Sequence, residues 1–251
     1  MSLFGKKNRH VAEKWNIRTM FGPNMSFSVT EAYKLLRANI MFSFSDEGRG
    51  HVIGITSSLQ SEGKSSTAVN TAYALAESGA KVLLMDADLR RPSVAAKLNL
   101  SRTPGLTNIL VAKGGDYREL LQQNQAAPGM DVLTSGDIPP NPSELLGSGR
   151  MEKLIGDLTR DYDYVIVDLP PVNVVSDAIA MSKCLDGVIM VVRSGVSEQR
   201  MLAEALRQLR LVNVRILGFV YRDNAAAGTK YGKKYNYKYK KYYSEYSKKK
   251  K

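Results

Sequence analysis

A Gly-Lys-Ser triplet at positions 63–65 is the part of this sequence best suited to chemistry. It follows an apolar run at 52–56 and a polar loop, and it opens a helical pattern. Backbone N–H groups that curl at the start of a helix bind phosphate, supported by the positive end of the helix dipole. In such a loop the lysine binds the β- and γ-phosphates of a nucleotide and the following hydroxyl binds Mg²⁺. We therefore expect a nucleotide site formed by Ser61, Glu62, Gly63, Lys64, Ser65 and Ser66.

The loop departs from the common phosphate-loop pattern at one position, because Ser58 stands where the first glycine is usual. An ordinary lysine at the start of a surface helix is the alternative interpretation of Lys64. Such a lysine would oppose the helix dipole unless an anion were bound there. The setting between a strand and a helix thus favours nucleotide binding.

Three aspartates follow two apolar runs that we expect to be strands. Asp86 and Asp88 follow the run 81–85, which we expect beside the strand that leads into the loop, and Asp168 follows the run 164–167. Carboxylates near a phosphate site can bind Mg²⁺ directly or through water, or can accept the proton of an attacking hydroxyl. One aspartate at the end of a strand could equally cap a turn, but three in this setting favour catalysis.

Short apolar runs alternate with helical patterns along most of the chain. We expect strands at 52–56, 81–85, 130–134, 164–167, 188–192 and 216–221, and helices at 30–40, 64–78, 150–160, 177–183 and 198–211. This alternation indicates an α/β fold with a mostly parallel central sheet and helices on both faces, whose ligand site lies at the carboxyl ends of the strands. The sequence predicts a flexible basic arm over 1–28, a folded domain over 29–225 and a disordered tail over 226–251.

The net charge of +12 is concentrated in the tail. The segment from Lys230 to Lys251 holds ten lysines and one glutamate, a net charge of +9, whereas the first 229 residues are nearly balanced. Seven of the thirteen tyrosines lie between Tyr231 and Tyr246. A basic aromatic tail can bind nucleic acid or an anionic membrane, but a balanced body argues against a nucleic-acid-binding domain.

Composition also excludes several classes of site. One cysteine, Cys184, rules out a disulfide framework and a cysteine-based zinc site, and two histidines make a His-rich metal site improbable. No apolar run approaches the roughly 20 residues of a membrane helix. We expect a cytoplasmic protein.

Taken together, the motifs resemble those of the bacterial tyrosine kinases of capsule and exopolysaccharide systems, the BY-kinases. The resemblance is carried by the loop end at 62–66, by the stretches 85–92, 139–146 and 168–171, and by the tyrosine-rich tail. It implies a P-loop NTPase-like fold and a protein-tyrosine kinase that uses ATP and Mg²⁺.

The resemblance also implies roles for the site residues. Lys64 and Ser65 would hold ATP and Mg²⁺, and Asp86 would deprotonate or orient the attacking tyrosine. Asp88 and Asp168 would organise the metal ion and its waters. Arg222 lies where relatives usually present Asn toward the base, and it could stack on the base or contact the ribose instead.

The tail is then best explained as a set of flexible acceptors for the kinase. The expected phosphoacceptors are Tyr231, Tyr235, Tyr237, Tyr239, Tyr242, Tyr243 and Tyr246. The resemblance implies a ring-like homo-oligomer in which each tail enters a neighbouring active site. Glu31, Lys34 and Arg37 resemble the family's Glu-x-x-Arg-x-x-Arg assembly motif, with Lys34 in place of arginine; a solvated helix face is the alternative.

The expected partners are protein substrates with tyrosines and a separate transmembrane adaptor, which would recruit the kinase to the inner face of the plasma membrane. We expect no nucleic-acid partner. Two other functions remain open: a regulatory ATPase of the partition and cell-division type, and a nucleotide-dependent scaffold. Leu59 stands where such ATPases carry a signature lysine, and the intact set of Lys64 and the aspartates argues against the scaffold.

Overall fold

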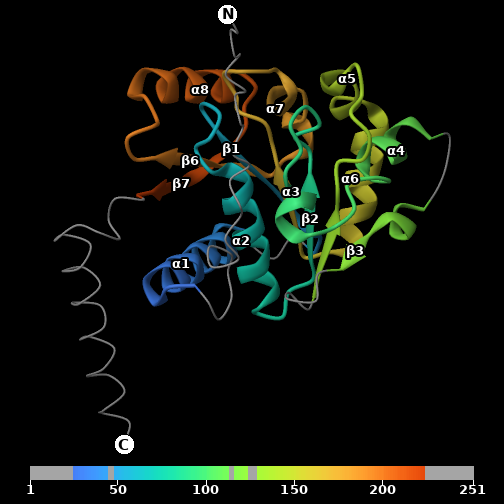
Figure 1. The fold of residues 1–251 in the computed structure, drawn as a ribbon, viewed down its shortest axis with the longest axis horizontal. Helices are drawn as coiled ribbons and strands as arrows, with labels where there is room; N and C mark the ends of the chain where they lie inside the picture. The colour runs from blue at the N-terminus through green and yellow to red at the C-terminus, as the bar shows by residue number, and fades with distance from the viewer. Residues whose placement is uncertain (1–24, 45–47, 113–115, 124–128, 224–251) are drawn as a thin grey trace, which may run out of the picture.

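The computed structural model describes residues 25–44, 48–112, 116–123 and 129–223 (Figure 1). Within these ranges one sheet has the strand order β3-β4-β2-β5-β1-β6-β7. Its strands are β1 (His51–Ser57), β2 (Val82–Asp86), β3 (Gln122–Gln123), β4 (Met130–Leu133), β5 (Tyr164–Asp168), β6 (Gly187–Arg193) and β7 (Ile216–Arg222). All pairs are parallel except β3 with β4.

Helices cover both faces of the sheet. The α-helices are α1 (Phe27–Ser43), α2 (Lys64–Ala76), α3 (Val94–Leu98), α4 (Leu106–Val111), α5 (Pro142–Leu146), α6 (Gly149–Asp161), α7 (Asp177–Ala180) and α8 (Gln199–Leu211), with 3₁₀ turns η2 (Tyr117–Leu120) and η3 (Ser182–Cys184). None of these described helices combines the length and hydropathy needed to cross a membrane.

Successive residues of each strand feed two separate cores. In β5, Val165 and Val167 pack with α4, α5, α6, α7 and α8, whereas Ile166 packs with α1, α2 and α3 on the other face. The same alternation occurs in β1, β2 and β6, because side chains point to opposite faces with a period of two. Both faces are covered, so the central strands are apolar at nearly every position.

The predicted fold class is confirmed, with two corrections. The first helix begins at Phe27 with Ser26 at its N-cap, three residues before the predicted start at Thr30. The strand β2 does not lie beside β1, because β5 is inserted between them. The short helices α3, α4 and α5 were not predicted, since segments of five or six residues are too short to show a helical period.

The start of β1 leaves no room for a side chain. A Cβ atom on Gly50 would lie 1.8 Å from the carbonyl oxygen of Tyr162. We expect Gly50→Ala to lower the free energy of unfolding by about 1–3 kcal/mol, because a backbone atom must move. Gly156→Ala in α6 is the control: its Cβ would meet no atom within 4 Å, and alanine favours the helix by about 0.5–1 kcal/mol. Urea unfolding measures both variants. Equal unfolding midpoints for Gly50→Ala and Gly156→Ala would contradict this packing.

Candidate functional site

The predicted phosphate loop joins β1 to α2 at the carboxyl edge of the sheet. Gly63, the N-cap of α2, has a φ of 98°, and Ser61 has a φ of 64°. Thr67 donates both its N–H and its hydroxyl to the Gly63 carbonyl, at 3.0 and 3.1 Å. The first N–H groups of a helix have no partner within the helix, so the start of α2 can receive an anion. The loop therefore has the geometry that phosphate binding requires.

Lys64 lies among the three aspartates. Its Nζ donates to Asp88 Oδ2 at 2.7 Å and lies 3.4 Å from Asp168 Oδ1. Burial lowers the pKa of Lys64, but the carboxylates of Asp168, Asp88 and Asp86 outweigh it and raise that pKa above its ordinary value. The lysine is thus held as an ammonium ion where a phosphate would need it.

Asp86 and Asp168 end neighbouring strands and are partners in the register of β2 and β5. Both side chains are fully buried. Burial, together with the charge of Asp168, raises the pKa of Asp86 to about 8, and burial raises that of Asp168 as well. Asp86 accepts backbone N–H groups of Asp88, Ser93 and Val94, at 3.3, 3.1 and 3.0 Å. It therefore fixes the loop after β2.

The donor set fits a hard cation that is shared with phosphate. Asp168 Oδ2 is buried and has no hydrogen-bond partner among the described residues. The Ser65 hydroxyl also bonds to the Asp168 carboxylate, and its Oγ lies 3.3 Å from Lys64 Nζ. In the described part of the chain no three acidic, histidine or cysteine side chains form a metal site by themselves. Mg²⁺ usually binds one or two carboxylates plus substrate phosphates, which this arrangement can supply.

Glu62 turns its side chain away from the phosphate position. Its carboxylate is fully buried and accepts the Leu59 N–H at 2.8 Å and the hydroxyls of Ser58 and Ser197. Only the backbone of Glu62 remains available to a nucleotide. Sequence reasoning missed Ser197, which lies 135 positions away in the β6–α8 loop and has no local signal.

Arg222, at the end of β7, covers the loop where α2 begins. A Cβ atom on Gly63 would lie 1.4 Å from Arg222 Nη1, so the guanidinium rests directly on this glycine. Lys97 of α3 was also missed by sequence reasoning. Burial lowers its pKa to about 8, although the charge of Asp168 opposes this shift. Both cations therefore stand near the predicted phosphate site.

A buried carboxylate connects two of the motifs behind the resemblance. Arg90, from the stretch 85–92, donates to both oxygens of Asp177, at 2.9 and 3.1 Å. Ser143, from the stretch 139–146, donates its hydroxyl to Asp177 Oδ1. The Asp177 side chain is fully buried at the start of α7. The network holds the segment after Asp88 against α5 and α7.

The predicted assembly residues make contacts within the chain. Lys34 pairs with Glu31 at 3.0 Å, and Arg37 donates to the Ala74 carbonyl at 2.9 Å and to Glu77 at 3.3 Å. The Arg37 contacts join α1 to the end of α2, whereas the pair of Lys34 and Glu31 lies within α1. Neither tests the predicted oligomer. All seven predicted phosphoacceptors, and residues 1–24 of the arm predicted over 1–28, lie outside the described residues.

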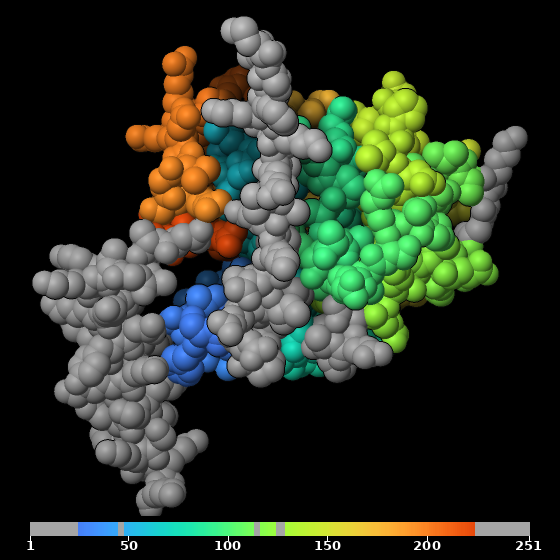
Figure 2. Space-filling model, in the orientation of Figure 1, coloured from blue at the N-terminus to red at the C-terminus, as the bar shows by residue number. Residues whose placement is uncertain are grey.

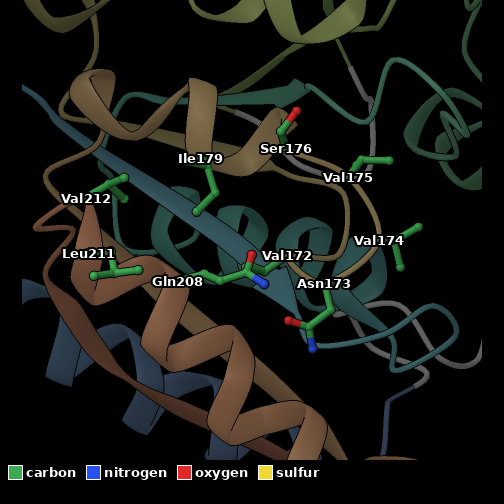
Figure 3. A pocket seen from close by; sticks show the side chains of 9 residues that line it. All are labelled: Val172, Asn173, Val174, Val175, Ser176, Ile179, Gln208, Leu211 and Val212. Carbon is green, nitrogen blue, oxygen red and sulfur yellow. The ribbon is translucent and has the colours of Figure 1, made fainter.

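An open groove of about 450 Å³ lies between the loop after β5, α7 and α8 (Figure 3). Val172, Val174, Ile179 and Leu211 give it an apolar lining, and none of the predicted site residues lines it. The candidate site is therefore the charged cluster around Lys64.

Comparisons with known proteins agree on one family. Residues 50–215 match the AAA domain family. The chain is 40% identical over 215 residues to tyrosine-protein kinase YwqD of Bacillus subtilis, covering 86% of this chain and 89% of that protein. Among solved structures, the chimerical protein CapA2B2 matches with a TM-score of 0.71 and 35% identity, covering 78% of this chain and 84% of that one. The kinase domain of Escherichia coli tyrosine kinase ETK matches with a TM-score of 0.72 and 32% identity, covering 77% and 74%.

The pairing of Arg90 with Asp177 gives a prediction about stability. Arg90→Ala leaves a fully buried carboxylate with fewer donors, which should lower the free energy of unfolding by about 1–2 kcal/mol, since Arg90 is itself partly solvated. Asp177→Asn in the same background should recover part of this loss. Arg207→Ala is the control, because its pair with Glu204 is exposed; a similar loss there would contradict the assignment. Urea unfolding measures all three.

Proposed function

The chain belongs to the family of the bacterial tyrosine-protein kinases, and we propose that it transfers the γ-phosphoryl group of ATP to tyrosines of its own carboxyl-terminal segment. The observation that carries this proposal is the contact of Lys64 with Asp88 and Asp168 beside the phosphate loop. The 40% identity to a tyrosine-protein kinase over 86% of the chain supports the reaction type. The process that it regulates is the synthesis and export of capsule or exopolysaccharide.

The phosphate loop and Lys64 bind the phosphates of ATP. The N–H groups at the start of α2 receive the phosphate oxygens, and Lys64 moves its ammonium from the aspartates to the β- and γ-phosphates. Ser65, Asp88 and Asp168 hold Mg²⁺, which when bound neutralises charge on the transferred group. Arg222 contacts the base or the ribose, a role supported by its position on Gly63.

Asp86 accepts or orients the proton of the tyrosine hydroxyl. Its full burial and its three backbone N–H partners also make it a support for the loop that carries Asp88. The two roles have different kinetic consequences. Loss of a proton acceptor lowers kcat alone, whereas loss of a support also weakens nucleotide binding.

The tail is the substrate in this proposal. Its seven tyrosines stand among ten lysines, in a segment of net charge +9. Each phosphate adds nearly two negative charges, so about five phosphates cancel this charge. Phosphorylation then weakens attraction of the tail to acidic surfaces and makes neighbouring tails repel.

The kinase acts as a ring-like homo-oligomer through Glu31, Lys34 and Arg37, with a separate transmembrane adaptor that holds it at the inner face of the plasma membrane. An exposed apolar surface on α1 supports an interface there: the side chain of Phe42 is 90% exposed and that of Leu35 is 59% exposed. Figure 2 shows α1 in blue, below the red end of β7. Other proteins with accessible tyrosines are further substrates.

The reaction is tested with purified protein, Mg²⁺ and γ-labelled ATP, alone and with an adaptor's cytoplasmic segment. We expect phosphotyrosine in the segment 231–246, with a rate at least 100-fold lower in Lys64→Met, because transition-state charge loses its partner. Lys153→Met on the exposed face of α6 is the control and should leave the rate unchanged. Mass spectrometry locates the label.

Other outcomes would favour the alternatives. Release of phosphate without labelled protein, with or without the adaptor segment, would indicate a regulatory ATPase. Nucleotide binding with neither release nor labelling under both conditions would indicate a scaffold.

The role of Asp168 in holding the metal is tested by binding. We expect Mg²⁺ to tighten ADP binding to the wild type at least tenfold, and to have little effect in Asp168→Asn, because the unpartnered Oδ2 has been removed. Asp157→Asn, an exposed site on α6, is the control. Isothermal titration calorimetry measures both, and an undiminished Mg²⁺ effect in Asp168→Asn would contradict the assignment.

A further inference from the structure

The phosphate loop contains a strained residue that its own sequence does not explain. Ser61 has a φ of 64°, in the left-handed region that non-glycine residues rarely adopt. Such a conformation persists only where the surroundings enforce it. The usual first glycine of the loop is replaced by Ser58. The shape of the loop therefore depends on contacts from elsewhere in the fold.

Glu62 provides those contacts inside the loop. Its Oε2 accepts the Leu59 N–H at 2.8 Å, and its Oε1 accepts the Ser58 hydroxyl at 2.9 Å. The fully buried carboxylate thus ties both ends of the loop apex together. A buried carboxylate needs further hydrogen-bond donors. The donors within the loop are the Ser58 hydroxyl and the Leu59 N–H, so any further donor must come from another segment.

The missing donors come from the β6–α8 segment, residues 193–198. Ser197 donates its hydroxyl to Glu62 Oε1, while its Oγ accepts the Arg193 N–H at 2.8 Å. The Ser197 hydroxyl hydrogen points to Glu62, because an ionised carboxylate can only accept a hydrogen bond. The Arg193 side chain donates to the Ser61 carbonyl at 2.8 Å, at the strained residue itself.

We propose that Ser197 and Arg193 are positioning residues, which hold the phosphate loop in its binding shape through Glu62 and the Ser61 carbonyl. Both residues contact the loop rather than the nucleotide. They therefore set the affinity of the loop for phosphates, whereas Lys64 and the aspartates act in the transfer step. The inference rests on the nucleotide site of the proposed function, and it assigns this site a support from a different part of the chain.

The test measures binding of ADP with Mg²⁺ by calorimetry, together with kcat and KM for ATP. We expect Ser197→Ala to raise Kd and KM about tenfold, since a donor to a buried charged group is lost, while kcat at saturating ATP stays within about twofold. Ser197→Thr keeps the hydroxyl and should restore most of the affinity. Ser194→Ala, in the same segment, is the matched control, because no hydroxyl bond joins Ser194 to the described residues.

A double-mutant cycle separates positioning from general stability. In the Glu62→Gln background, Ser197→Ala should cause less than a twofold further change in Kd, because the two side chains act as one unit. Arg193→Met removes only a surface contact, so it can be tested even if Ser197→Ala does not fold. We expect the Kd of Arg193→Met for ADP to rise about threefold or more. The inference would be overturned if folded Ser197→Ala and Arg193→Met both bound ADP with the wild-type Kd. Additive effects of Glu62→Gln and Ser197→Ala on Kd would also overturn it. Absence of ADP binding by the wild type would instead overturn the proposed nucleotide site, and the inference with it.

Discussion

The carboxyl edge of the sheet depends on the charge balance around the Lys64 ammonium group. Asp86 and Asp168 are fully buried and Asp88 is 4% exposed, and Lys64 is the cation that contacts Asp88 and Asp168. A buried carboxylate without a compensating charge costs several kcal/mol. Part of this cost is avoided because the pKa of Asp86 is raised to about 8 by burial and by Asp168. Lys64 balances the charge of Asp88 and Asp168 by direct contact, and Lys97 adds a nearby positive charge. In the proposed function the phosphates of the nucleotide need the Lys64 ammonium group as well.

The sheet order is what brings these groups together. Since β5 lies between β2 and β1, Asp168 faces the end of the phosphate-loop strand on one side and Asp86 on the other. The connection from β1 through α2 to β2 leaves a gap of one strand in the sheet, and β5 occupies this gap. A direct β1–β2 pair would have placed Asp86 beside the loop and moved Asp168 away from Lys64. The correction to the expected strand order is therefore a condition for the cluster.

Local patterns predicted the central strands, the longer helices and the residues of the cluster. Apolar runs of four or five residues that end in Asp86 or Asp168 carry their signal within the run itself. The insertion of β5 was not predictable, because all these runs are equally apolar and their order depends on packing over the whole chain. The hydrogen bond from Ser197 to Glu62 was not predictable either, because 135 positions separate the two residues and neither residue type is distinctive. Sequence reasoning thus found the charged residues of the cluster and missed distant contacts to the phosphate loop, such as that of Ser197.

The two roles proposed for Lys64, contact with the aspartates and contact with phosphates, have a thermodynamic consequence for binding. A nucleotide that draws the ammonium to its phosphates takes the compensating charge from Asp88 and Asp168. The carboxylates then need another cation, and Asp168 Oδ2 has no hydrogen-bond partner among the described residues. The proposed function therefore requires positive coupling between nucleotide and Mg²⁺, and by reciprocity each would raise the affinity for the other by the same factor. In the proposed function the cluster thus binds the metal more tightly when the phosphates contact Lys64, and it binds the phosphates more tightly when the metal is present.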